Sequence, residues 1–297
     1  MNLNDDPLPP QPPDSSEVTL RIDPETEAAP TTILEVPIAL EQLVPEDLRA
    51  AWGWLDLSLF LLVGIVAFLG LGLILIAGIA LAHIHLAEIQ TSPRLAGILN
   101  VIADVFLFLT LMGYLALQMR LRFRVPFWRT IGWRPLERGY SPPALRLFGF
   151  IATGFVLALV VQIGSTIFGT KTELPIERLF EDRLTVILVL ALSVLMAPLV
   201  EETIFRGYIY PVVARSFGRG IAIVATGTLF GLLHAAQLWG GWTQIALLVF
   251  VGIVLTYTRA ATRTVVASYL VHLGYNLTVS VGFIVGTHWL KVLPPPP

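Results

Sequence analysis

Three short patterns of charged and polar residues interrupt apolar stretches in the C-terminal half of the chain. In the first, EETIFR, Glu201, Glu202 and Arg206 follow the apolar run LALSVLMAPLV. In a helix, Glu202 and Arg206 pair across one turn, and Glu201 lies about 100° away from Glu202 around the axis. An ionised residue at mid-membrane costs roughly 2.5–3.5 kcal/mol. The pattern therefore indicates either a functional site or an ion pair that fixes the depth of a helix.

The other two patterns each place a histidine in an apolar setting. TLFGLLHAAQ sets Phe230 and His234 four residues apart, and SYLVHLGYN sets Ser268, His272 and Asn276 at successive intervals of four. The second spacing forms one polar stripe on a helix, and such a stripe must face protein or water. Structural interpretations stay open, because polar residues also form hydrogen bonds between membrane helices.

If the three patterns meet in space, they can hydrolyse a peptide bond. Among Glu201, His234, His272 and Asn276, a carboxylate and an imidazole can hold and deprotonate one water, while imidazole and amide N–H groups face the developing oxyanion. The glutamate and the two histidines could instead bind Zn²⁺ with one position open for water, although the spacing HExxH is absent. The sequence leaves the cofactor open between Zn²⁺, another divalent metal and no metal.

The three patterns resemble those of the CAAX-processing and bacteriocin-processing (CPBP, or ABI) intramembrane proteases, which are related to type II CAAX prenyl endopeptidases. The family pattern EExxxR matches the first pattern, FxxxH the second and HxxxN the third, in that order along residues 184–287. The resemblance implies a site of six residues: Glu201, Glu202, Arg206, His234, His272 and Asn276.

The same resemblance implies a membrane-embedded endopeptidase that cleaves CAAX-type or other membrane-associated peptides. In it Glu201 activates water with help from His234, His272 and Asn276 stabilise the oxyanion, and the Glu202–Arg206 pair supports them. Whether the enzyme is of the metallo or the glutamate type is undecided. The implied partners are a peptide or protein substrate and the lipid bilayer.

The composition of the chain indicates the kind of protein that carries these residues. Of the 297 residues, 55% are hydrophobic and 13% are charged, with a mean hydropathy of +0.76. Soluble globular chains carry roughly 25% charged residues, so we predict an all-α, multi-pass membrane protein and no nucleic-acid binding. The chain has no cysteine, which excludes disulfides, thiol nucleophiles and cysteine-bound zinc.

Seven apolar runs are long enough to be transmembrane helices. They are residues 55–82, 95–119, 144–168, 184–208, 220–238, 243–259 and 264–287. Six arginines lie between the second and third runs, and a seventh, Arg146, lies at the start of the third. By the positive-inside rule this loop, and with it the N-terminus, is predicted to be cytoplasmic.

The runs divide the chain into five predicted segments. These are a disordered, acidic, proline-rich tail (1–36), a juxtamembrane helix (37–54), accessory spans with the basic loop (55–143), the protease-like core (144–290) and a proline-rich end (291–297). We expect Trp52 and Trp54 to anchor at the membrane interface and Pro198 to bend its helix. A simple up-and-down topology does not require Glu201 and His234 to share a depth.

Two functions from other classes remain as alternatives. The first is a non-catalytic immunity or scaffold protein, although such a protein has less need of costly buried polar residues. The second is a proton-coupled transporter, against which stands the lack of an evident internal repeat. The sequence predicts no oligomeric state.

Overall fold

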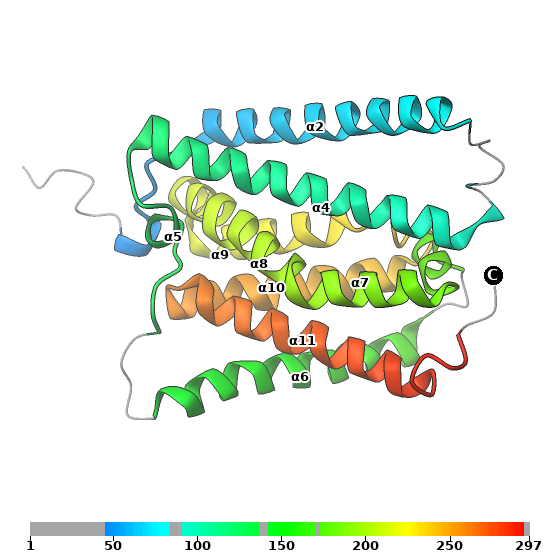
Figure 1. Ribbon diagram of the computed structural model, residues 1–297. Helices are drawn as coiled ribbons and strands as arrows, with labels where there is room; N and C mark the ends of the chain where they lie inside the picture. The colour runs from blue at the N-terminus through cyan, green and yellow to red at the C-terminus, as the bar shows by residue number, and fades with distance from the viewer. Residues whose placement is uncertain (1–44, 84–88, 90, 137–141, 170–172, 294–297) are drawn as a thin grey trace, which may run out of the picture. The chain divides into compact units, whose positions relative to one another are not determined.

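The computed structural model describes residues 45–83, 89, 91–136, 142–169 and 173–293, and every element in these ranges is helical (Figure 1). The predicted all-α fold is confirmed. The long helices are α2 (Trp54–Leu81), α4 (Pro93–Leu117), α6 (Pro143–Phe168), α7 (Arg183–Leu195), α9 (Tyr210–Leu233), α10 (Trp242–Thr262) and α11 (Val265–Gly286). The shorter helices are η1 (Glu46–Leu48), η2 (Gln118–Phe123), α5 (Phe127–Thr130), η3 (Pro175–Phe180), α8 (Ala197–Glu202) and η4 (Thr203–Ile209). The predicted tail 1–36 lies outside the described residues.

Six helical stretches in the described residues are long and apolar enough to cross a membrane. The chain is therefore an integral, multi-pass membrane protein. The count differs from the seven runs of the sequence because the fourth and fifth runs lie within one helical stretch, Arg183–Leu233. Its 51 residues would extend about 77 Å if straight, against a hydrocarbon core of about 30 Å. The stretch must therefore be broken.

Two breaks divide this stretch. The first separates α7 from α8 at Met196, two residues before Pro198, where the proline predicted a bend. The second lies at Gly218, whose φ of 82° and ψ of 162° are almost exclusive to glycine. The rings of Phe205 and Phe230 contact each other with centroids 5.2 Å apart. The segments before and after Gly218 therefore pack side by side, as the arms of a helical hairpin.

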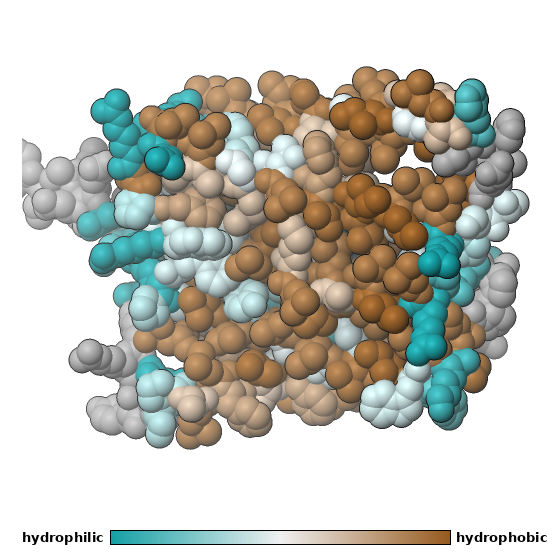
Figure 2. Space-filling view, viewed as in Figure 1, coloured by the Kyte–Doolittle hydropathy of each residue, from teal (hydrophilic) through white to brown (hydrophobic). Residues whose placement is uncertain are grey.

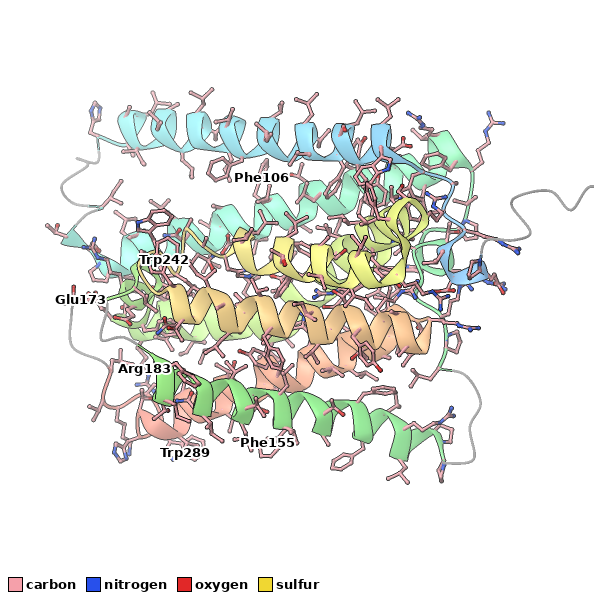
Figure 3. The ribbon with its side chains drawn as sticks, turned by 180° about the vertical axis from the view of Figure 1, so that it is seen from behind. Phe106, Phe155, Glu173, Arg183, Trp242 and Trp289 are labelled. Carbon is pink, nitrogen blue, oxygen red and sulfur yellow. The ribbon has the colours of Figure 1, made fainter. Side chains whose placement is uncertain are left out.

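The lipid-facing surface is apolar between two polar ends (Figure 2). Figure 3 shows Phe155 pointing outward from α6, with Trp242 and Trp289 at one end of the helices beside Glu173 and Arg183. Tryptophans prefer the level of the lipid headgroups, so the aromatic residues at this end mark a membrane boundary.

Glycines bring the helices around the hairpin into close contact. A Cβ at Gly227 of α9 would collide with the backbone of Ile253, and one at Gly252 of α10 would collide with the Gly227 carbonyl. Small residues allow such backbone contact between membrane helices. The close approach fixes α10 against the second arm of the hairpin, next to the residues of the first sequence pattern.

The segment before α2 packs into the protein rather than along the membrane interface. Trp52 is 2% exposed, stacks on Tyr208 at 5.1 Å and donates its Nε1–H to the Tyr208 carbonyl at 2.8 Å. The expectation that Trp52 anchors at the interface is wrong, whereas Trp54 is 49% exposed. Of the predicted helix 37–54, the part described before α2 contains the short η1.

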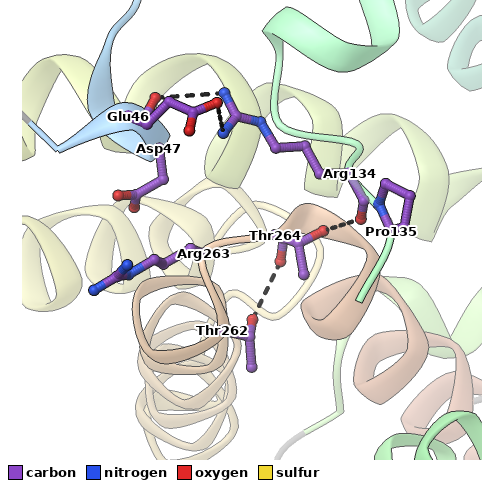
Figure 4. A pocket seen from close by; sticks show the side chains of 7 residues that line it. All are labelled: Glu46, Asp47, Arg134, Pro135, Thr262, Arg263 and Thr264. Atoms are coloured by element: carbon purple, nitrogen blue, oxygen red, sulfur yellow. Dashed lines mark hydrogen bonds and ion pairs between the residues drawn. The ribbon is translucent and has the colours of Figure 1, made fainter. Parts of the chain in front are cut away.

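Ionic contacts hold this segment at the arginine-rich end of the helices. Asp47 accepts from Arg219 at 3.3 Å and from Arg259 at 3.4 Å, and Arg134 donates to Glu46 at 2.9 Å. A cavity of about 110 Å³ lies beside these contacts (Figure 4). Its lining residues are Glu46, Asp47, Arg134, Pro135, Thr262, Arg263 and Thr264. None of the six predicted site residues lines it.

Candidate active site

The carboxylate of Glu201 lies between two histidines. Its Oε1 is 3.9 Å from Nε2 of His234, and its Oε2 is 3.7 Å from Nε2 of His272. Glu201 belongs to α8, His234 ends α9, and His272 belongs to α11. The side chains of Glu201 and His234 are 15% and 26% exposed, so the carboxylate can be reached from outside the protein.

The hairpin explains why Glu201 and His234 share a depth. Glu201 precedes Gly218 by 17 residues and His234 follows it by 16, which corresponds to about 25 Å and 24 Å of helix. Arms of equal length bring their ends to one level. The question that the sequence left open is therefore answered by the position of the break at Gly218.

Behind this carboxylate lies a fully buried ion cluster. Oε1 of Glu202 accepts from NH1 of Arg206 at 2.9 Å and lies 3.0 Å from Nδ1 of His272. Neither Glu202 nor Arg206 is exposed. A buried charge without a partner is costly, so each member of the cluster depends on the others. The expected pairing of Glu202 with Arg206 across one turn is present.

The guanidinium of Arg206 is held by α10 as well as by Glu202. NH2 of Arg206 donates to the Gly252 carbonyl at 2.9 Å, and Nε donates to the hydroxyl of Thr256 at 3.3 Å. Neither residue was predicted from the sequence. Little in the sequence indicated them, because a glycine and a threonine are common in apolar helices. The contact at Gly252 is made by a backbone carbonyl, which every residue has. Gly252 serves twice, since the same residue permits the close approach of α10.

Phe230 packs against the charged and polar side chains of the site. Its ring lies 5.0 Å from the ring of His234, 5.7 Å from that of His272 and 4.6 Å below the guanidinium carbon of Arg206. The aromatic face attracts the cation and excludes water from it. This accounts for the phenylalanine of the second sequence pattern.

Hydrogen bonds set the orientation of both imidazoles. Nδ1 of His234 lies 2.9 Å from the Phe230 carbonyl, which can only accept, so Nδ1 carries the proton. Nδ1 of His272 faces the Glu202 carboxylate in the same way. Both rings therefore point Nε2 toward Glu201, at distances that are too long for a direct hydrogen bond.

The residues of the polar stripe on α11 make contacts with different parts of the protein. His272 joins the site, whereas Nδ2 of Asn276 donates to the backbone carbonyl of Ser193 in α7 at 2.7 Å. Ser268 is fully buried and donates to the carbonyl of Val265 in its own helix at 3.1 Å. Five of the six predicted residues thus form one connected cluster, and Asn276 joins α11 to α7.

A carboxylate and two imidazoles are donor types found in catalytic zinc sites. Among the described residues, however, no group of three or more His, Asp or Glu side chains is arranged so that it could hold a metal ion. We therefore assign no metal ligand and derive no chemical step through a metal.

Comparison with known proteins confirms the family resemblance for the part of the chain that carries this cluster. Residues 183–278 match the family described as type II CAAX prenyl endopeptidase Rce1-like. The Rce1-like match begins at the first residue of α7 and ends within α11, so it includes all six predicted site residues. Helices α2, α4 and α6 lie outside it.

One similar curated protein extends the comparison beyond the Rce1-like region. It is the UPF0177 protein YbdI of Lactococcus lactis subsp. lactis (strain IL1403), 26% identical over 146 residues. The matched region makes up 48% of this chain and 77% of that protein. No solved structure matches the chain.

Proposed function

We propose that this protein is an intramembrane endopeptidase in which Glu201 activates the attacking water. The observation that carries the proposal is the placement of both Glu201 oxygens opposite the Nε2 atoms of His234 and His272, 3.9 and 3.7 Å away. These gaps are too long for direct hydrogen bonds, and a water between the groups can donate one proton to Glu201 and one to His234. Its lone pair then remains available for attack.

The proposed reaction proceeds through a tetrahedral intermediate. Glu201 removes one proton from the water while the water oxygen bonds to the carbonyl carbon of the substrate. The carbonyl oxygen becomes an oxyanion, and the protonated form of His272 donates to it from Nε2. Glu202 accepts from Nδ1 of that ring, so its negative charge stabilises the imidazolium. Glu201 then passes its proton to the leaving amine as the C–N bond breaks.

The remaining predicted residues have supporting parts in this mechanism. Arg206 keeps the buried Glu202 in place through their 2.9 Å contact. Asn276 carries a second N–H besides the one that it donates to Ser193, and we assign that second donor to the oxyanion. The description of the matched family favours CAAX-type peptides as substrates, and other membrane-associated peptides fit the same chemistry.

Purified protein in detergent provides the test. We expect wild type to cleave a prenylated CAAX peptide or members of a mixed peptide library, and Glu201→Gln to lower kcat by about a thousandfold or more with an unchanged thermal transition. Full activity of Glu201→Gln would refute the role of the base. Each sample is assayed with and without a chelator, which reports whether a metal is required. Absence of cleavage in all samples favours the non-catalytic scaffold.

We further propose that the arginine-rich end of the helices faces the cytoplasm, with the N-terminus on the same side. The cysteine-free chain allows a direct test by single substitutions at two exposed positions. Trp289→Cys should react with a membrane-impermeant thiol reagent on intact cells, and Arg263→Cys should react after lysis. The reverse pattern would invert the proposed topology.

A further inference from the structure

A carboxylate outside the three sequence patterns lies near the middle of the membrane helix α4. Asp104 makes no hydrogen bond or ion pair with the other described residues. An unpaired carboxylate at this depth is costly and is a candidate for function.

Helical spacing places Asp104 on the inner face of α4. One stripe along α4 is formed by residues spaced three, four or seven positions apart, which in a helix share a face. These are residues 97, 104, 108, 111 and 115. At one end of the stripe, Gly97 lies against Thr185 of α7, and at the other Leu115 is fully buried. Phe108 packs against the hydrophobic cluster that contains Phe230.

The inner face of α4 is directed toward the candidate active site. Helix α4 contacts both α7 and α8, and α8 carries Glu201. Asp104 is close enough to Glu201 and His234 to interact electrostatically with both. Nδ1 of His234 is occupied by the Phe230 carbonyl and Nε2 faces Glu201, so Asp104 is not the partner that orients this ring.

The candidate site and Asp104 together hold more carboxylates than cations. Asp104, Glu201 and Glu202 supply three carboxylates, and Arg206 is the cation paired within this set. When all three carboxylates are ionised, the set carries two excess negative charges with neutral histidines and one with a protonated histidine. Glu202 is fully buried and its Oε1 already contacts Arg206 and His272, so a substrate cannot reach it, and the proposed mechanism commits Glu201 to water. Asp104 is therefore the carboxylate left to receive a cation.

We propose that Asp104 is a specificity-determining residue that favours substrates with a lysine or arginine side chain next to the scissile bond. The inference rests on the proposed peptidase function. The basic side chain lies along α4 with its charge at the Asp104 carboxylate, while the peptide carbonyl faces Glu201. In a site of low dielectric such a charge-assisted contact discriminates strongly against a neutral side chain.

Pairs of peptides that differ only in charge test this inference. Each pair carries lysine or acetyl-lysine at one position, moved stepwise across the cleavage site, and kcat/KM is measured with purified protein in detergent. For wild type we expect the lysine peptide to be preferred about tenfold at one position, which corresponds to one charged hydrogen bond. Asp104→Asn should reduce this ratio to about one, and Asp104→Glu should retain it.

The control is Asn100→Ala, one turn from Asp104 on the same helix. Asn100 is exposed and bonds to the Ala96 carbonyl of its own helix at 2.9 Å, so its replacement should leave the wild-type ratio unchanged. Because each ratio is internal to one protein sample, partial loss of folded protein does not alter it.

A wild type without preference for lysine, or an equal preference in Asp104→Asn, would overturn the inference while the peptidase function stands. Failure of wild type to cleave any peptide would instead overturn the proposed function, and the inference with it.

Discussion

Glu201 and His234 approach to 3.9 Å because the chain reverses at Gly218, almost midway between them in the sequence. A second pair across the hairpin, Phe205 and Phe230, has the same relationship and packs ring against ring at 5.2 Å. The hairpin thus aligns the Glu201–His234 contact of the candidate site and an aromatic contact in one register. Any change in the position of the break would separate both pairs.

Gly218→Ala should destabilise the protein. A φ of 82° with a ψ of 162° strains any residue with a Cβ by about 1–3 kcal/mol, although no atom crowds this position. We expect the thermal transition in detergent to fall by several degrees. Gly220→Ala is the matched control, since Gly220 is also uncrowded and lacks the positive φ. An equal effect of both substitutions would contradict the role of backbone conformation at Gly218.

Arg206→Ala should cost about 3–5 kcal/mol, because it leaves the buried carboxylate of Glu202 without its cation. Yields of folded protein and the thermal transition report the loss. The double variant Glu202→Gln with Arg206→Met removes both charges, and we expect it to recover much of the stability. Its kcat should remain about 10–100-fold low, since His272 has lost the carboxylate that stabilises its protonated form in the proposed mechanism. Recovery of full activity would show that the pair serves folding alone.

His234→Ala and His272→Ala should both lower kcat, each by about 100–10,000-fold, because in the proposed mechanism one imidazole holds the reacting water and the other donates to the oxyanion. Their effects on stability should differ. The side chain of His234 is 26% exposed, whereas that of His272 is 4% exposed and bonded to buried Glu202. Thermal unfolding should therefore separate the two variants, with His272→Ala the less stable. Equal stability combined with undiminished turnover would argue against both assignments.

Trp52→Ala should destabilise the protein by about 3–5 kcal/mol, since it removes a buried ring that stacks on Tyr208. Trp52→Phe keeps much of the packing and loses the hydrogen bond to the Tyr208 carbonyl, at a cost of about 1 kcal/mol from that bond. The half-exposed Trp54 provides the comparison, and its replacement by alanine should cost less than that of Trp52. If Trp54→Ala proves the more damaging in thermal unfolding, the segment before α2 does not stabilise the helices as inferred.

The candidate site residues can be recognised in the sequence because charged residues are rare within apolar runs. Glu202 and Arg206 follow from helical spacing alone, since a four-residue interval fixes their pairing wherever the helix lies. The contacts that complete the cluster could not be predicted in this way. The Gly252 carbonyl and the Thr256 hydroxyl come from another helix, and nothing in their spacing refers to Arg206.

Burial of the aromatic residues also depended on tertiary structure. Trp52 and Trp54 are two residues apart in a polar-to-apolar transition, which predicts interface anchors for both. Only the packing of Tyr208 against Trp52 distinguishes them. Asn276 illustrates the same limit, because its spacing from His272 indicates a shared polar face but does not reveal the Ser193 carbonyl that it bonds.

Hydropathy and spacing along the chain are enough to predict a helical membrane protein and the polar residues that enter the membrane. Hydropathy and helical periodicity are local properties, and a lipid environment leaves few backbone conformations besides the helix. Which of these residues meet depends on how the helices pack. The reversal at Gly218, the close approach at Gly252 and the inward face of Asp104 depend on contacts between distant helices, and those contacts follow from shape and charge complementarity that no single segment contains.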